Sequence, residues 1–182
     1  MAQPDSPSDD VFLPGGHLRH ELLNDDAAVA LQASLRCARE THWDSVRSPH
    51  LFMGLLAAPD AGLRNWGERL GADLPRLLEQ FRELFHQEEC ECAGDLPVCL
   101  HREFLSDNVL RVLREAHQRA QEHQRGELTP LDLLISLFTT PQSIVAECFE
   151  RIGVTAAKLT ELAVMAEHNG RGDNERGEKA KK

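Results

Sequence analysis

The chain has 182 residues, 41% of them hydrophobic, and a formal net charge of −10 at pH 7. A surface this acidic repels phosphate backbones, which argues against a nucleic-acid partner. The sequence contains no run approaching the roughly 18 apolar residues of a membrane span, and its first ten residues lack the basic and apolar regions of a signal peptide. It therefore predicts a cytoplasmic protein without membrane or nucleic-acid partners.

Both ends of the chain are predicted to be flexible. Residues 1–20 form an N-terminal segment that begins with a Pro/Ser/Asp-rich stretch, and residues 169–182 form an almost wholly polar tail. Such compositions bury too little apolar surface to offset the entropy lost on ordering. The packed part of the chain is therefore expected to span residues 21–168.

Residues 23–86 are predicted to form four helices. Asn24 is a helix N-cap followed by two carboxylates, which suit the positive end of a helix dipole. Ser48 is expected to cap a second, densely apolar helix, with Pro49 at its first position, where a missing N–H costs nothing. Gly71 suits the left-handed position that follows the third helix.

The sequence then repeats itself. Residues 23–81 align without a gap with residues 105–163 at an offset of 82 residues, and thirteen of the 59 aligned pairs are identical. Two copies of one unit must bury a shared interface. We therefore predict an all-α fold of eight helices in two pseudo-symmetric four-helix repeats packed as one domain, with repeat one at 23–86, a linker at 87–103 and repeat two at 104–168.

The order and spacing of several short motifs resemble the N-terminal domain of Clp-type AAA+ unfoldases, the Clp repeat domain. The matching stretches are Leu23–Ala27, His50–Leu56 and Leu70–Asp73 in the first copy and Leu105–Ser106, Leu133–Phe138 and Ile152–Val154 in the second. The resemblance implies a double four-helix repeat that docks adaptors and substrate segments. It also implies a module without catalytic residues, cofactors or metal ligands.

The sequence resembles a free-standing version of this domain without the AAA+ ATPase modules. The string most similar to a phosphate-binding loop, GxxxxGK[ST], is Gly172–Lys179, which has Glu178 where the lysine is required. The resemblance thus implies a non-enzymatic adaptor, accessory subunit or regulator of a Clp chaperone or protease. Its expected partners are protein or peptide segments, namely a Clp ATPase, a Clp peptidase or their clients.

Two departures from the family pattern bear on ligand chemistry. Some members use a glutamate in each repeat to bind phosphorylated arginine, but the aligned positions here hold Pro49 and Leu131, which cannot pair with a guanidinium. The neighbouring family histidine is kept as His50 in repeat one and replaced by Asp132 in repeat two. We expect His50 to be a capping or packing residue near a helix start.

The linker offers an alternative function. Three thiols and two imidazoles lie within a short acidic stretch and consist of Cys90, Cys92, Cys99, His86 and His101. Such a set can surround zinc or act as a redox-responsive pair, although Cys-x-Cys is not the spacing of common zinc knuckles. A metal-responsive or redox-responsive regulator built on Cys90, Cys92 and Cys99, with His86 or His101, is therefore the alternative hypothesis.

Other reactive side chains are expected to have structural roles. A cysteine-hydrolase set of Cys37, His42 and Asp44 is rejected, because Cys37 belongs to a packed helical stripe and no oxyanion loop accompanies it. His117 and His123 lack the i,i+4 spacing of a helical metal site. The default for both histidines is a solvated polar face.

The two tryptophans are candidates for packing or for partner contacts. Trp66 aligns with Cys148 on the third helix of each repeat and is expected in the core or half-exposed in a groove. Trp43, in the loop after the first helix, is the better candidate for an exposed contact. We expect an apolar groove between the repeats to accept a helix or an extended segment, with the acidic surface steering basic partners.

Overall fold

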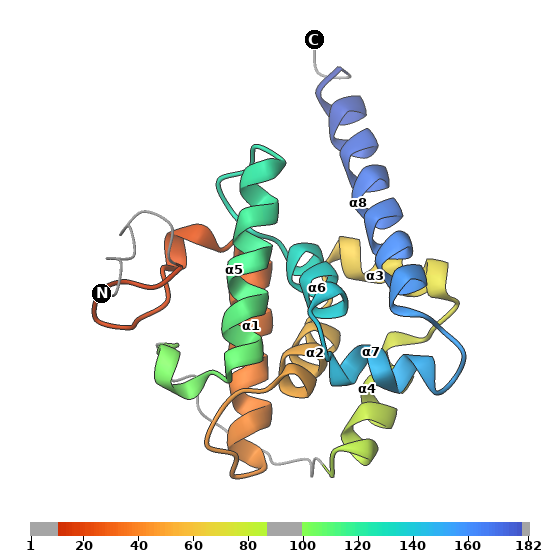
Figure 1. The fold of residues 1–182 in the computed structure, drawn as a ribbon. Helices are drawn as coiled ribbons and strands as arrows, with labels where there is room; N and C mark the ends of the chain where they lie inside the picture. The colour runs from red at the N-terminus through yellow and green to blue at the C-terminus, as the bar shows by residue number, and fades with distance from the viewer. Residues whose placement is uncertain (1–10, 87–99, 180–182) are drawn as a thin grey trace.

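The structure, a computed structural model, describes residues 11–86 and 100–179 and is built from helices (Figure 1). The eight α-helices are α1 (Asp25–Glu40), α2 (Ser48–Ala57), α3 (Ala61–Leu70), α4 (Leu74–Leu84), α5 (Asp107–Glu122), α6 (Pro130–Thr139), α7 (Ile144–Glu150) and α8 (Ala156–Lys179). The same described ranges also contain two short 3₁₀-helices, η1 (His20–Leu22) and η2 (Arg102–Phe104). Over the described ranges, β-type pairing is limited to isolated bridges. The predicted all-α fold with four helices in each repeat is confirmed.

Side-chain caps begin the first helix of each repeat at the expected residues. Asn24 Oδ1 accepts a hydrogen bond from the Ala27 N–H at 2.8 Å, and Ser106 Oγ accepts one from the Val109 N–H at 3.4 Å. Gly71 has a φ of 71° and ends α3 in the left-handed conformation, as its position predicts. The helix boundaries are therefore set largely by local sequence.

The start of α2 differs from the prediction. Ser48 is the first helical residue rather than the N-cap, and Arg47 occupies the cap position. The cap hydrogen bond comes instead from His50, whose Nδ1 accepts the Arg47 N–H at 3.0 Å. In repeat two, the side chain of the N-cap residue itself makes the cap, because Thr129 Oγ1 accepts a hydrogen bond from the Asp132 N–H at 3.4 Å.

Helices α2 and α6 form the centre of the fold. All residues of 48–56 and of 130–138 are buried. Helix α1 packs on α2 and α5 on α6, while α4 also packs on α2 and α8 on α6 (Figure 1). A Cβ atom at Gly54 would lie 2.5 Å from the Ala30 carbonyl oxygen, so glycine is what allows α1 and α2 to approach this closely.

The two repeats are joined by a reciprocal pair of backbone bridges. Leu23 pairs in parallel with Leu128, and Val46 pairs in parallel with Leu105, so each repeat binds its first-helix entry to the other repeat's loop between its first two helices. The hydrogen bonds correspond as well: Leu128 N–H donates to the Leu22 carbonyl at 2.8 Å, and Val46 N–H to the Phe104 carbonyl at 2.7 Å. These bridges give the fold its pseudo-twofold symmetry.

One aromatic cluster crosses the repeat boundary. The Phe52 ring lies 4.7 Å from the Phe81 ring within repeat one, and 6.2 Å and 5.8 Å from the rings of Phe138 and Phe149 in repeat two. Because rings from both repeats pack in one cluster, the repeats share a single core, as the duplication predicts.

The N-terminal segment differs from its prediction over residues 11–20. Val11, Phe12 and Leu18 are buried, and the Leu18 N–H donates a hydrogen bond to the Leu100 carbonyl at 2.9 Å. Burial of these three apolar side chains offsets the entropy lost when residues 11–20 become ordered. The prediction of a flexible segment was based on the composition of residues 1–20 as a whole, in which polar residues dominate. Residues 1–10 lie outside the described residues.

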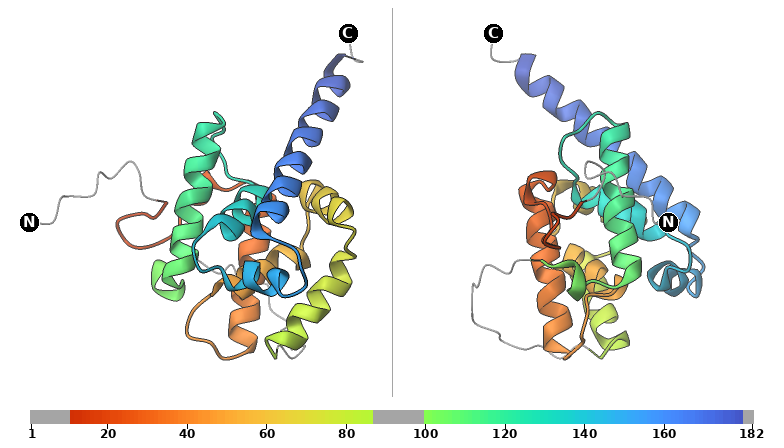
Figure 2. Two further views of the ribbon diagram at one scale, coloured as in Figure 1. Left: turned by 45° about the vertical axis from the view of Figure 1, so that its right-hand side comes forward. Right: turned by 60° about the vertical axis from the view of Figure 1, so that its left-hand side comes forward.

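The C-terminal tail also differs from its prediction. Helix α8 continues to Lys179, past residue 169, and its last part projects beyond the other helices (Figures 1 and 2). Once the packed first half of α8 has formed, each added residue extends an existing helix without a new nucleation cost. Within residues 11–86 and 100–179, none of the helices combines the length and apolar character that a membrane span requires.

Candidate protein-binding groove between the repeats

A groove lies between α4 of repeat one and α7 of repeat two, which lie next to each other in Figure 1. Its volume is about 540 Å³. Its walls come from α4, α7 and the turn after α7, and consist of Leu77, Gln80, Phe81, Glu83, Leu84, Cys148, Phe149 and Ile152. We call this site the interrepeat groove.

The interrepeat groove has an aromatic floor and an exposed apolar rim. Phe81 and Phe149 are buried, and their ring centroids lie 5.9 Å apart. At the rim, Leu84 is 52% exposed and Ile152 is 73% exposed. Large apolar side chains gathered at the mouth of a concave surface mark an interaction site. The predicted apolar groove between the repeats is therefore present.

Local sequence explains how the two helices present these side chains. On α4, Leu77, Phe81 and Leu84 follow the i, i+4, i+7 spacing that places them on one helix face. On the other side, α7 is short, and Gly153, with a φ of 84°, turns the chain directly after Ile152. Ile152, just before this turn, lies at the rim of the groove.

The thiol at the groove wall lacks the lowered pKa of a nucleophilic cysteine. Burial raises the pKa of the Cys148 thiol above its ordinary value, so the thiol stays protonated at neutral pH. A protonated thiol behaves as a small apolar side chain. Cys148 therefore contributes shape to the interrepeat groove rather than nucleophilic chemistry.

Cys37 likewise lacks the character of a nucleophile. It is buried in α1, and burial raises the pKa of its thiol to about 11. The side chain of Asp44, from the rejected hydrolase set, is 87% exposed in the loop after α1. The structure therefore supports the structural role that the sequence predicts for Cys37.

His50 is a capping residue, as predicted. It is 4% exposed and accepts the Arg47 N–H through Nδ1, which holds the imidazole in its neutral form. Burial and the nearby Arg47 charge lower the pKa of His50 from 6.5 to about 4. The corresponding residue in repeat two, Asp132, is fully buried and is held by arginines.

The low pKa of His50 predicts a loss of stability in acid. In the unfolded chain the imidazole regains its ordinary pKa near 6.5, so between pH 6.5 and 4 the unfolded state binds more protons than the folded state. We expect the free energy of unfolding to fall by about 2–3 kcal/mol between pH 7.5 and pH 4.5 because of this residue. Urea unfolding curves across that range measure the change.

The matched control for this prediction is His50→Asn, which keeps a side-chain acceptor for the Arg47 N–H but does not titrate in this range. Between pH 7.5 and pH 4.5, the free energy of unfolding of this variant should fall by about 2–3 kcal/mol less than that of the wild type. Parallel pH profiles for the two proteins would assign the acid sensitivity to other groups.

The positions that bind phosphorylated arginine in some relatives offer no acceptor here. Pro49 and Leu131 are both buried at the starts of α2 and α6. Neither side chain carries a carboxylate for a guanidinium. The departure identified in the sequence therefore removes this ligand chemistry from both positions.

The two tryptophans have different environments. Trp66 is fully buried, and its Nε1–H donates to the Leu159 carbonyl at 3.3 Å, so it belongs to the core. Trp43 is 46% exposed, and the Arg47 guanidinium carbon lies 4.2 Å from the centroid of its ring. Trp43 is thus accessible to a partner, as predicted, although Arg47 already covers one ring face.

The alternative metal site cannot be assembled from the described residues. Cys90, Cys92 and Cys99 lie outside them, and His101 Nε2 lies 2.8 Å from the Gly15 carbonyl oxygen. Over residues 11–86 and 100–168, no three His, Cys, Asp or Glu side chains are grouped as metal ligands. The metal-responsive hypothesis stays a hypothesis, which metal analysis of the purified protein and a triple Cys→Ser variant would test.

The histidines of α5 show no grouping with metal-binding geometry either. His117 is buried, and its Nε2 lies 3.1 Å from the Gln121 amide nitrogen one turn later. His123 occupies the C-cap position of the helix. The sequence placed both on a solvated face, and the burial of His117 corrects that placement: this face of α5 packs inward.

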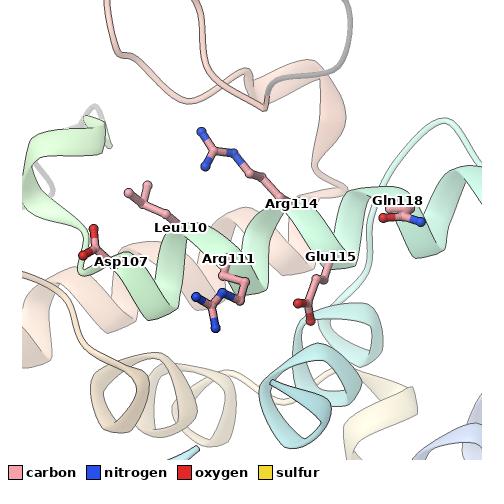
Figure 3. Close-up of a pocket in the computed structure, with 6 residues that line it drawn as sticks. All are labelled: Asp107, Leu110, Arg111, Arg114, Glu115 and Gln118. Carbon is pink, nitrogen blue, oxygen red and sulfur yellow. The ribbon is translucent and has the colours of Figure 1, made fainter. Parts of the chain in front are cut away.

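A second hollow lies along α5 and has a different character (Figure 3). Its volume is about 310 Å³, and all its lining residues come from this single helix: Asp107, Leu110, Arg111, Arg114, Glu115 and Gln118. Its lining carries both charge signs, and Glu115 already accepts a hydrogen bond from Thr140 at 3.3 Å. A mixed-charge face on one helix is typical of a solvated surface, so the interrepeat groove is the stronger candidate.

Sequence reasoning predicted the groove but did not identify its residues. The available signal was the alignment of the two copies, which pairs Trp66 with Cys148 and Leu70 with Ile152. A large side chain opposite a small one in an otherwise similar repeat indicates a place where the two halves pack differently.

Comparison with known proteins agrees with this architecture. The family model of the Clp repeat (R) N-terminal domain matches residues 104–180. The search of curated proteins found no match.

Three solved structures share the fold. The N-terminal domain of the caseinolytic protease associated chaperone ClpD from Arabidopsis thaliana is 18% identical, with a TM-score of 0.59, over 81% of this chain and 96% of that one. The N-terminal domain of the ClpV1 ATPase of Escherichia coli is 15% identical, with a TM-score of 0.57, over 81% and 86%. The N-domain of ClpV from Vibrio cholerae is 19% identical, with a TM-score of 0.54, over 80% and 84%. The family model thus matches the second repeat, and these solved structures share the fold over most of the chain.

Proposed function

We propose that this chain is a non-enzymatic protein-binding module that acts in the cytoplasm as an adaptor, accessory subunit or regulator of a Clp-type AAA+ chaperone or protease. The observation that carries the proposal is the interrepeat groove, whose rim exposes Leu84 and Ile152. The fold supports it, since similar domains belong to a protease-associated chaperone and to ClpV ATPases.

The groove suits a segment of another protein better than a small polar substrate. Its floor and rim are apolar, and Gln80 and Glu83 are the polar residues of its lining. Burying one large apolar side chain of a partner there would contribute roughly 1.5–3 kcal/mol. The net charge of −10 would raise the rate of encounter with basic partners.

Substituting the groove rim tests this proposal. The change Ile152→Asp places a carboxylate at a 73% exposed position, so it should disturb binding with little cost to folding. We expect affinity capture from the source lysate with wild-type bait to enrich a Clp ATPase or peptidase. Capture with Ile152→Asp should fall about tenfold or more, because binding would bring the new carboxylate against apolar side chains.

Val29→Asp is the matched control, because Val29 is also an exposed large apolar residue, at 47%, but lies on α1 outside the groove. It should capture the same components as the wild type. Equal capture by Ile152→Asp and Val29→Asp would rule out the groove as the binding site. Absence of every Clp component from the wild-type capture would count against the adaptor role itself.

A further inference from the structure

The interrepeat groove has a counterpart inside the same molecule. At the 82-residue offset, α4 corresponds to α8 and α7 corresponds to α3, so the α4–α7 pair that forms the groove corresponds to the α8–α3 pair. In the structure, α3 packs along α8. The α3–α8 interface therefore shows what a filled version of the groove contains.

The side chain that fills the α3–α8 interface is Trp66. It is fully buried, and its ring centroid lies 5.8 Å from that of Phe138. Its Nε1–H donates to the Leu159 carbonyl at 3.3 Å, which joins α3 to α8. An indole is thus accommodated between these two helices with its polar N–H satisfied.

The aligned residues in the groove leave that place open. Cys148 aligns with Trp66 and lines the groove, and Leu77, which aligns with Leu159, lines it from α4. A thiol is much smaller than an indole, and Cys148 is only partly buried. The space beside Cys148 and Leu77 is therefore open as part of the groove. Phe81 and Phe149, which align with the small residues Ala163 and Gly67, fill the part beneath it.

The floor of the groove limits which part is open. Phe81 takes the position of Ala163, and its ring packs near the Phe149 ring at the bottom of the groove. The open part therefore lies above these rings, between the exposed side chains of Leu84 and Ile152. A floor of two aromatic rings favours a third ring, which gains edge-to-face or offset contacts beyond simple burial.

We propose that the interrepeat groove binds one tryptophan, or a comparably large aromatic side chain, presented by a segment of a partner protein. The partner's ring occupies the place between α4 and α7 that Trp66 occupies between α3 and α8. It packs on Phe81 and Phe149, and the Leu77 carbonyl is the acceptor that corresponds to that of Leu159. This inference rests on the proposed protein-binding function and names the chemistry of the partner.

The test uses the full chain and a soluble indole probe, N-acetyl-5-fluorotryptophanamide, observed by fluorine NMR. The wild type should broaden and shift the probe signal, and Cys148→Ser should do the same. In Cys148→Trp, the chain's own indole fills the groove, so binding of the probe should fall about tenfold or more. Circular dichroism melting should show Cys148→Trp to be at least as stable as the wild type, because it fills an open space.

Should Cys148→Trp fail to fold, Ile152→Asp tests probe binding without a larger side chain, because it places a carboxylate at the rim of the groove. Val29→Asp is the control for this variant and should bind the probe as the wild type does. No binding of the probe to the wild type, or equal binding to Cys148→Trp and Ile152→Asp, overturns the aromatic assignment. If a Clp component is captured through the groove but the probe does not bind, this inference fails and the proposed function stands. If the probe binds as described but no Clp component is captured, the inference stands and the adaptor role fails.

Discussion

Replacing Trp66 with alanine is expected to lower the free energy of unfolding by about 3–5 kcal/mol, the range for deleting a large aromatic side chain from a packed core. Trp66 is fully buried and lies in the aromatic cluster that both repeats share, with its ring 6.4 Å from that of Phe52. It also carries the hydrogen bond from α3 to Leu159 on α8. Urea unfolding followed by circular dichroism measures the loss.

The control for this prediction is Trp43→Ala. Trp43 is 46% exposed, so its removal should cost no more than about 1 kcal/mol, despite the contact with Arg47. These two residues are the only tryptophans of the chain. The two variants therefore compare the same substitution at a buried and at an exposed position. Similar losses for the two variants would show that Trp66 does not anchor α3 to α8.

The second large effect is expected at Asp132, where alanine should cost about 3–5 kcal/mol, because removing one partner of a buried ion pair leaves its charged partners uncompensated. Asp132 is fully buried. Arg125 donates to its two carboxylate oxygens at 2.5 Å and 2.7 Å, and Arg119 Nε lies 3.3 Å from Oδ1. Both arginines also pair with Glu167 on α8, so the network ties α5, α6 and α8 together.

Asp132→Asn keeps the size of the side chain and removes its charge, so a large loss in this variant as well would assign the effect to the ion pairs. Asp44→Ala is the surface control: its contact with Arg47 spans 3.9 Å with both side chains at least half exposed, and its loss should cost no more than about 1 kcal/mol. Thermal and urea unfolding of the three variants measure these differences. A loss below about 1 kcal/mol for Asp132→Ala would contradict the role of the network.

The sequence predicted the helical architecture because the relevant signals are local. Caps such as Asn24 and Thr129, and the left-handed Gly71, act on their immediate neighbours, and the duplication then fixed how many helices to expect. The prediction for the start of α2 was wrong by one residue. Arg47 rather than Ser48 holds the N-cap position, and His50 accepts the Arg47 N–H.

The groove residues depend on tertiary packing, which no local pattern reports. Leu70 and Ile152 are aligned and similar, yet Leu70 is partly buried against the core, while Ile152 is 73% exposed. Their difference arises from what each helix packs against: α3 has α8 beside it, and α7 faces the groove. For the same reason, the burial of Val11, Phe12 and Leu18 was missed, since three apolar residues in a polar segment form no periodic pattern.

The reciprocal bridges between Leu23 and Leu128 and between Val46 and Leu105 make this chain the covalent equivalent of a symmetric dimer. In a dimer of identical subunits, the twofold axis makes every site occur twice with the same residues. Joining the two halves in one chain removes that constraint, so one copy of a site can change while the other does not. Here one copy holds Trp66 and is closed, and the other holds Cys148 and is open. Under the proposed function, this pair of sites offers a partner one groove, where the corresponding dimer would offer two or none.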